Sequence, residues 1–156
     1  MSQPTRLTGA QETSLAIAAA VVTANAYYIH PIIAEVADYF GVSHSRIGLV
    51  PALNQIALAV GIFLLLPLGD RISNRRLTIT FAAGQTASIA LMAIAQGFTL
   101  FVIGSTMLGF FTIAPYLLPA YASKRVAPER LGQVTAKLAA GVILGILVAR
   151  VGAGVV

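Results

Sequence analysis

The sequence predicts an all-α membrane protein with five transmembrane helices. The chain of 156 residues is 58% hydrophobic and only 10% charged, whereas soluble domains are typically about 45–50% apolar and about 25% charged. Its apolar residues form long runs, and residues 47–68 and 77–95 contain no charged side chain. A helix that rises about 1.5 Å per residue needs about 20 residues to cross the hydrocarbon core. Helices are favoured because lipid offers no partners to backbone polar groups.

Five apolar segments are long enough to span a membrane. They are preceded by a polar stretch, residues 1–14, which carries Arg6 and Glu12 and is predicted to be a cytoplasmic tail. Residues 15–156 then form one transmembrane bundle. A cleaved signal peptide is not indicated, because the first apolar run is itself long enough to span. The predicted spans are about 15–34, 47–68, 77–95, 98–118 and 131–156.

The distribution of Lys and Arg predicts a cytoplasmic N-terminus. Loops that face the cytoplasm carry the excess of these residues, and the connections predicted on the other side carry only Arg46. The same asymmetry explains the net charge of +5, so a nucleic-acid partner is not indicated. The bacterial inner membrane, with its lipids, is the predicted location. The residues predicted on the cytoplasmic side are Arg6, Arg71, Arg75, Arg76, Lys124, Arg125 and Arg130.

Proline and glycine predict where the helices bend or end. Pro31 removes a backbone hydrogen bond and is expected to kink the first span. Pro115 and Pro119 predict a bend in the fourth span. The residues expected to end the first helix and to cap the second are Gly41 and either Ser43 or Ser45.

The sequence does not indicate an enzyme or a cofactor. It contains no nucleophile elbow, phosphate-binding loop or zinc-protease motif. His30 and His44 are separated by a helix end and lack companion ligands, so no metal site is predicted. The chain has no cysteine, which excludes a disulfide framework and a thiolate metal site.

Several polar side chains lie inside the predicted spans, where two interpretations stay open. An unpaired amide or imidazole in hydrocarbon costs several kcal/mol, so these groups must face partners or water. They either form hydrogen bonds between helices, worth about 0.6–2 kcal/mol each, or line a cavity. The candidate cavity-lining residues are Asn25, Tyr28, His30, Gln55, Tyr116 and Arg150, and Gln85 invites the same two interpretations.

The last span carries two cations and a small-residue motif. Arg150 lies 19 positions after Leu131, about 28 Å along a straight helix; it either extends to the outer interface or faces the bundle interior. Lys137 is close enough to the inner surface to extend toward it. Gly141 and Gly145 form a G-x-x-x-G motif, which predicts close helix packing.

The loop between the second and third spans is the most informative motif. It reads Gly69-Asp70-Arg71-Ile72-Ser73-Asn74-Arg75-Arg76 after Pro67-Leu68, and it resembles the signature between the second and third helices of major facilitator superfamily transporters. The first span, with Asn25-Ala26-Tyr27-Tyr28-Ile29-His30-Pro31 and then Phe40-Gly41-Val42-Ser43, resembles the opening of the bacterial proton-coupled drug and sugar efflux proteins (drug:proton antiporters) of this superfamily.

The resemblance implies twelve helices in two six-helix halves, with a small organic substrate bound between the halves and proton-driven efflux by alternating access. This chain would supply five helices of the N-terminal half, and its end at Val156 without a polar flank predicts a truncated transporter that is inactive without the missing C-terminal half. Asp70 would latch the inner face against a helix of the second half, and Arg71, Arg75 and Arg76 would hold lipid phosphates.

The chain departs from the family pattern at four places. His30 replaces a usual glutamine, Ser105 stands where many antiporters carry an arginine, and Ala149-Arg150 replaces a Gly-Pro pair. The loop also has one residue more than the commonest spacing between its acid, Asp70, and its arginine pair. His30 is therefore a candidate proton carrier. The alternative interpretation is a small membrane scaffold that does not transport and oligomerises through Gly141 and Gly145.

Overall fold

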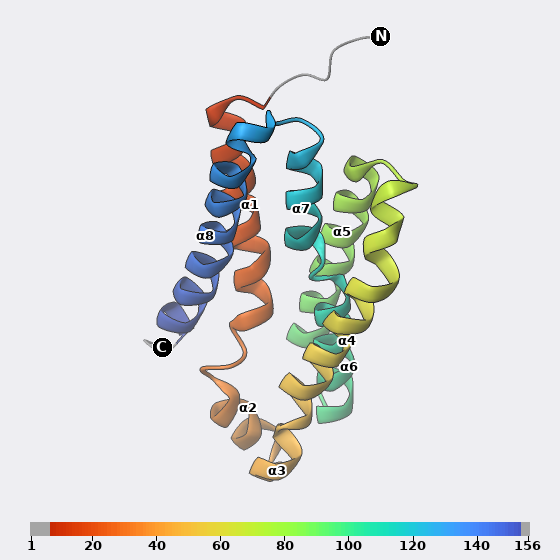
Figure 1. The fold of residues 1–156 in the computed structure, drawn as a ribbon. Helices are drawn as coiled ribbons and strands as arrows, with labels where there is room; N and C mark the ends of the chain where they lie inside the picture. The colour runs from red at the N-terminus through yellow and green to blue at the C-terminus, as the bar shows by residue number, and fades with distance from the viewer. Residues whose placement is uncertain (1–6, 154–156) are drawn as a thin grey trace.

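The computed structural model describes residues 7–153, without the side chains of residues 66, 70 and 74. Arg6 and the last three residues of the fifth predicted span lie outside the described residues. Residues 7–153 contain helices and no strand, which confirms the predicted all-α class (Figure 1). The helices are α1 (Gly9–Tyr27), α2 (Ile33–Phe40), α3 (His44–Ile47), α4 (Leu49–Leu65), the 3-10 helix η1 (Leu66–Asp70), α5 (Asn74–Ala93), α6 (Phe98–Phe111), α7 (Ala114–Ser123) and α8 (Pro128–Ala153).

Within residues 7–153, three helical stretches are long and apolar enough by themselves to cross a membrane. They are His44–Gly69, Phe98–Ser123 and Pro128–Ala153, each of 26 residues. At about 1.5 Å per residue, each reaches about 39 Å and exceeds the hydrocarbon thickness. They contain the second and fourth predicted spans and residues 131–153 of the fifth. α1 and α5, with 19 and 20 residues, run alongside them (Figure 1), and their crossing of the membrane stays a prediction from the sequence.

The first helix begins earlier and ends earlier than the predicted first span. It begins at Gly9 because Thr8 and Gln11 form a capping box, in which each side chain bonds the backbone N–H of the other. Residues 9–14, predicted as part of a tail, are therefore helical. The helix ends at Tyr27, and residues 28–32 form turns around Pro31 before α2 begins. The proline lacks an N–H and restricts the preceding residue, which explains the break.

The other predicted breaks follow the same local chemistry. Gly41 ends α2 with a positive φ of 60°, and the Ser43 hydroxyl caps α3 by accepting from the Arg46 N–H. The fourth span is divided into α6 and α7 at residues 112–113. Pro115 lies in the first turn of α7, where its missing N–H costs little.

The helices pack in two groups. α1 pairs with α8, while α4 and α5 both pack on α6, and α7 lies between the groups (Figure 1). Glycines allow the closest approaches: a Cβ at Gly141 or Gly145 would collide with the backbone carbonyl of Ala16 or Ala20 in α1. In the other group, a Cβ at Gly109 of α6 would collide with the carbonyl of Asn54 in α4.

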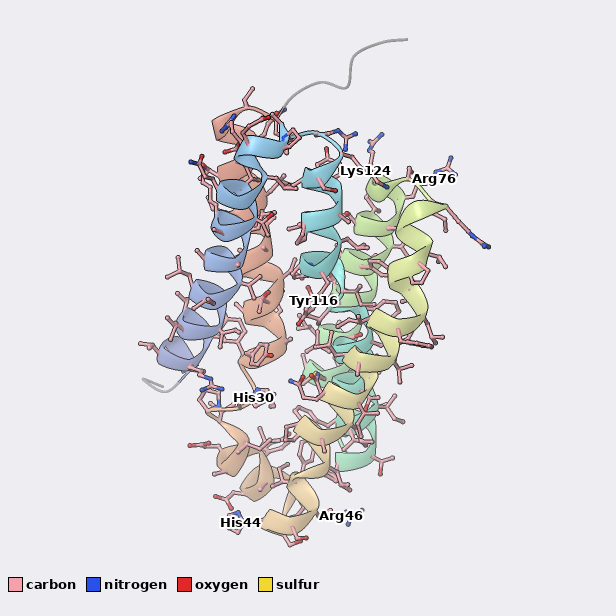
Figure 2. All side chains as sticks on the ribbon, viewed as in Figure 1. His30, His44, Arg46, Arg76, Tyr116 and Lys124 are labelled. Carbon is pink, nitrogen blue, oxygen red and sulfur yellow. The ribbon has the colours of Figure 1, made fainter. Side chains whose placement is uncertain are left out.

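Cationic side chains gather at one end of the bundle. Figure 2 shows Arg76 and Lys124 at the end where α4 meets α5 and α7 meets α8, and His44 and Arg46 at the opposite end. Apolar clusters lie beneath both ends. One contains Ile47, Val50 and Phe101 beside α2 and α3, and another contains Leu7, Ala122, Val134 and Leu138 at the cationic end.

Candidate functional site: a polar network between two broken helices

The side chain of Gln85 joins three helical segments in the interior of the bundle. Gln85 lies on α5 and is only 4% exposed. Its Nε2 donates to the Val22 carbonyl oxygen of α1 and to the Thr112 hydroxyl, each at 3.1 Å. Its Oε1 accepts from Asn25 Nδ2 at 3.4 Å. A buried amide without partners would cost about 1–3 kcal/mol, so these contacts satisfy Gln85 and tie α1 to α5.

The network joins the places where two of the predicted spans are interrupted. Thr112 follows α6 directly, at the break before α7, and its hydroxyl also donates to the Leu108 carbonyl at 2.6 Å. Asn25 lies in the last turn of α1, which ends at Tyr27. Interrupted membrane helices are typical of the substrate and ion sites of secondary transporters, because the freed backbone groups line a cavity rather than lipid.

His30 lies beside this network at the α1–α2 break. Its ring stacks on Tyr27, with centroids 5.2 Å apart and planes 22° apart, and its backbone N–H donates to the Tyr27 carbonyl. The ring is half-buried, and its Nδ1 has no hydrogen-bond partner among the described residues. Tyr28 and Tyr116 are more open, at 43% and 44% exposed, and Figure 2 shows Tyr116 between the two helix groups.

Gln55 is separate from the network. The buried face of α4 consists of Val50, Asn54, Ala57, Leu58 and Gly61, and Gln55 lies on its exposed side. The buried amide is Asn54, which is fully enclosed and donates to the Ser105 carbonyl oxygen at 2.7 Å. The amide that joins α4 to α6 is therefore Asn54, the neighbour of the Gln55 that the sequence analysis named as a candidate cavity-lining residue.

Arg150 is exposed in the last turn of α8. Its guanidinium is close enough to His30 for an electrostatic interaction between the two groups. A permanent cation, Arg150, and a titratable ring, His30, therefore lie in the same part of the folded molecule, although they come from the last and first predicted spans. The two interpretations of Arg150, at the outer interface or in a cavity, both stay compatible with this exposed position.

The predicted loop motif forms a tight connection at the cationic end. Gly69 and Asp70 end η1. The backbone N–H groups of Arg71 and Ile72 then donate hydrogen bonds to the Leu68 carbonyl oxygen at 3.0 and 2.8 Å. A Cβ at Gly69 would lie 3.1 Å from a methyl group of Leu117, so glycine lets the loop rest against α7. The guanidinium residues are exposed, and the Asp70 side chain lies outside the described part of the chain. The exposed residues are Arg71, Arg75 and Arg76.

A cavity of about 680 Å³ lies between α1, α7 and this loop. Gly69 and Arg75 of the loop line it, together with mostly apolar residues such as Ala18 and Leu118. Val22 also lines it, and the carbonyl of Val22 accepts from Gln85. The cavity has the size typical of small-molecule sites, about 300–1,000 Å³, and its lining includes Val22 as well as Lys124 and Arg125 of the cationic end. Within the described residues no cluster of His, Asp and Glu suits a metal ion.

Sequence reasoning missed two residues besides Asn54. Thr112 was not singled out, although a hydroxyl three residues before Pro115 was a usable signal for a break with free backbone groups. Glu12 was placed in a polar tail, but its carboxylate is buried and bonded to Arg130. No local signal identifies that partner, because the two residues are 118 positions apart.

Comparisons with known proteins agree with this architecture. The sequence profile described as Major Facilitator Superfamily matches residues 15–156. The chain is 29% identical over 140 residues to two curated proteins, "Putative uncharacterized transporter YgaY" from Escherichia coli strain K12 and "Uncharacterized transporter YgaY" from E. coli O157:H7. Each match covers 90% of this chain and 36% of the relative, so the chain spans just over a third of their length. No solved structure matches the chain.

The profile match covers all five predicted spans and both helix breaks. Together with the apolar helices, it makes this an integral membrane protein. The chain belongs to the Major Facilitator Superfamily.

Proposed function

We propose that the chain forms the first five spans of a twelve-helix secondary transporter that uses the proton gradient to export small organic molecules. The Gln85 network is the observation that carries this proposal, because it places buried polar groups at two helix breaks. The family match and the transporter names of the relatives support transport. The substrate would bind between this part and the second half of the complete protein.

The residues around the network would form this half of the substrate path. Asn25, Tyr28, His30 and Tyr116 lie at or beside the helix breaks, and His30 is the group whose charge changes most readily near neutral pH. Arg150 would add a permanent cation to the path from the last turn of α8. Gln55 would join the path from the exposed side of α4.

The cationic end would face the cytoplasm of a bacterial cell. Figure 2 shows Arg76 and Lys124 there, and Arg75 and Arg125 line the same cavity as Lys124. The positive-inside rule orients such loops toward the cytoplasm. Their charges would meet inner-leaflet phosphates. Asp70 would act as a latch near the positive end of a helix in the second half, an interaction worth about 0.3–1 kcal/mol and more when partly buried.

A scaffold that oligomerises through Gly141 and Gly145 is the competing function. In the structure these glycines face the Ala16 and Ala20 carbonyls of α1. The small-residue face is therefore already covered within one chain, which favours the transporter over a scaffold that needs this face for a second copy.

Exchange of Asp70 for asparagine tests the proposed transport. In inside-out vesicles that contain the complete transporter, acridine orange reports the proton gradient while ethidium, norfloxacin or arabinose is added. We expect at least one compound to release protons, and we expect D70N to slow that release several-fold at equal protein level, because the amide carries no charge for the helix end.

Asp38→Asn is the matched control, because Asp38 is an exposed acid at the opposite end of the bundle. Release at the normal rate in D70N would remove the latch from the mechanism. Uptake or release of the compound that persists after the proton gradient is collapsed would contradict proton-driven export.

A further inference from the structure

The N-terminal segment Leu7–Glu12 is docked onto the connection between α7 and α8. Leu7 is 9% exposed and packs with Ala122, Val134 and Leu138. Its backbone N–H donates to the Arg125 carbonyl at 3.3 Å. The capping box at Thr8 then starts α1 directly after this contact. Leu7 and the first turns of α1 are therefore a folded element with its own contacts, and not a solvated tail.

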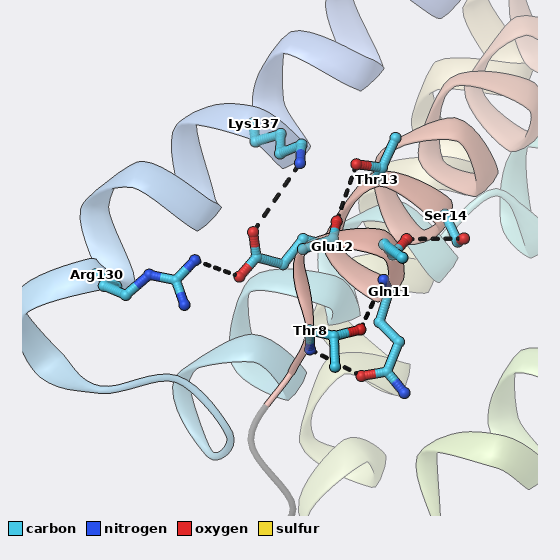
Figure 3. A network of polar contacts seen from close by, with 9 residues as sticks. Thr8, Gln11, Glu12, Thr13, Ser14, Arg130 and Lys137 are labelled. Carbon is cyan, nitrogen blue, oxygen red and sulfur yellow. Dashed lines mark hydrogen bonds and ion pairs between the residues drawn. The ribbon is translucent and has the colours of Figure 1, made fainter.

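Glu12 lies in the first turn of α1 and points at α8 (Figure 3). Its Oε1 accepts a hydrogen bond from Arg130 Nη2 at 2.9 Å, and its Oε2 lies 4.0 Å from Lys137 Nζ. The Glu12 side chain is only 6% exposed. A buried carboxylate is costly unless it is paired, and the positive end of the helix dipole also favours it at this position.

We propose a clasp that fixes the cationic end of α1 to α8, so that the two helices move as one body. The clasp consists of the apolar contacts of Leu7 and the ion pairs of Glu12 with Arg130 and Lys137. Glu12 is a positioning residue in this clasp. The proposal concerns this chain alone, because it requires neither a substrate nor a second half.

The clasp lies at one end of the contact between α1 and α8, and two glycines bring the same two helices together further along. Gly141 and Gly145 bring the backbone of α8 against Ala16 and Ala20 of α1, which lie one to two turns beyond Glu12. By contrast, α1 meets α5 through the hydrogen bonds of Gln85 at a helix break. The α1–α8 contact is thus held by charge and backbone packing, whereas the contact of α1 with α5 is held by the hydrogen bonds of Gln85.

The unequal burial of the partners gives the clasp a measurable signature. The side chains of Arg130 and Lys137 are 54% and 41% exposed, against 6% for Glu12. Loss of Arg130 leaves a buried carboxylate with only the more distant Lys137, and such an uncompensated charge is strongly destabilising. Loss of the Glu12 charge leaves two cations that water already reaches, which costs less.

A double-mutant cycle in lipid nanodiscs tests the clasp by circular dichroism at 222 nm. Arg130→Gln should lower the Tm by about 5–10 °C, and Glu12→Gln should lower it less. The double variant Glu12→Gln/Arg130→Gln should be more stable than Arg130→Gln alone, because the buried charge is gone. Glu129→Gln removes the exposed acid beside Arg130 in the first turn of α8 and should lower the Tm much less than Arg130→Gln, because it loses only a weak helix-dipole interaction. Additive losses in the double variant, or an equal loss from Glu129→Gln, would overturn the proposal.

Spin labels give a second readout that separates positioning from general stability. The chain contains no cysteine, so Thr13→Cys in α1 and Gln133→Cys in α8 can be labelled without further changes, and both positions are exposed. We expect a narrow distance distribution in the otherwise unchanged chain, a broader one with Glu12→Gln, and a narrow one with Glu129→Gln. An unchanged distribution with Glu12→Gln would show that the clasp does not hold the two helices together.

Discussion

Adding a single methyl group at Gly145 is expected to separate α1 from α8. A Cβ at this position would overlap the Ala20 carbonyl oxygen and the Ala20 Cα of the facing helix. Those are backbone atoms in the middle of a helix, so they cannot rotate away as a flexible side chain would. Overpacking typically costs about 1–3 kcal/mol, and a backbone collision lies at or above the top of that range.

The measurement is the Tm of Gly145→Ala in nanodiscs, with Gly152→Ala as its control. Gly152 lies on the same helix and a Cβ there meets nothing within 4 Å. In an open helical position alanine is more stable than glycine by about 1 kcal/mol. The two substitutions are chemically identical, so we expect opposite signs: a Tm lowered by about 5–10 °C at Gly145 and an unchanged or raised Tm at Gly152.

The same reasoning applies to the second helix group. A Cβ at Gly109 would overlap the Asn54 carbonyl of α4, so Gly109→Ala should destabilise the α4–α6 contact as Gly145→Ala destabilises the α1–α8 contact. A raised Tm in Gly145→Ala would contradict the close packing on which the two-group description depends.

Replacing Gln85 by leucine is expected to abolish transport by the complete protein while the chain stays folded. The substitution keeps most of the side-chain volume and removes the bonds to Val22, Asn25 and Thr112. Each polar group that stays buried without a partner costs about 1–3 kcal/mol of stability. Transport should suffer more, because Gln85 is the side chain that joins the end of α1 to the α6–α7 break.

Thr86→Ala is the matched control, because Thr86 is the next residue on α5 and its hydroxyl returns to the Ala82 carbonyl of the same helix. Proton release in inside-out vesicles should be lost in Gln85→Leu and kept in Thr86→Ala, at comparable protein levels. Normal release in Gln85→Leu would mean that the network only holds the helices together and takes no part in transport.

Local sequence signals predicted the helices and their breaks because each depends on nearby residues. The uncharged run 47–68 could only be a buried or membrane helix, and Pro31 and Pro115 each mark an interruption through the missing N–H. The spacing of Gly141 and Gly145 likewise predicts a close approach whichever helix the partner is. The Major Facilitator Superfamily profile matches residues 15–156, which include these helices and their breaks.

Features that depend on tertiary contacts were less predictable. Gln55 and Asn54 are adjacent amides, and only the rotation of α4 about its axis decides that Asn54 is buried. Glu12 resembles any acid in a polar terminus until α8 brings Arg130 against it. The start of α1 at Gly9 was missed for a local reason, because the Thr8–Gln11 capping box was not recognised in a stretch interpreted as a tail.

The central claim is that the chain crosses the membrane repeatedly with its cationic end in the cytoplasm, and labelling of single cysteines tests it most directly. Ser45, Ser73, Gln96 and Ser123 are exposed positions in successive connections, and the chain has no cysteine of its own. In intact spheroplasts, a membrane-impermeant maleimide should label cysteines at 45 and 96, and should label cysteines at 73 and 123 only after permeabilisation. Labelling of position 73 or 123 in intact spheroplasts, or protection of position 45, would contradict this account.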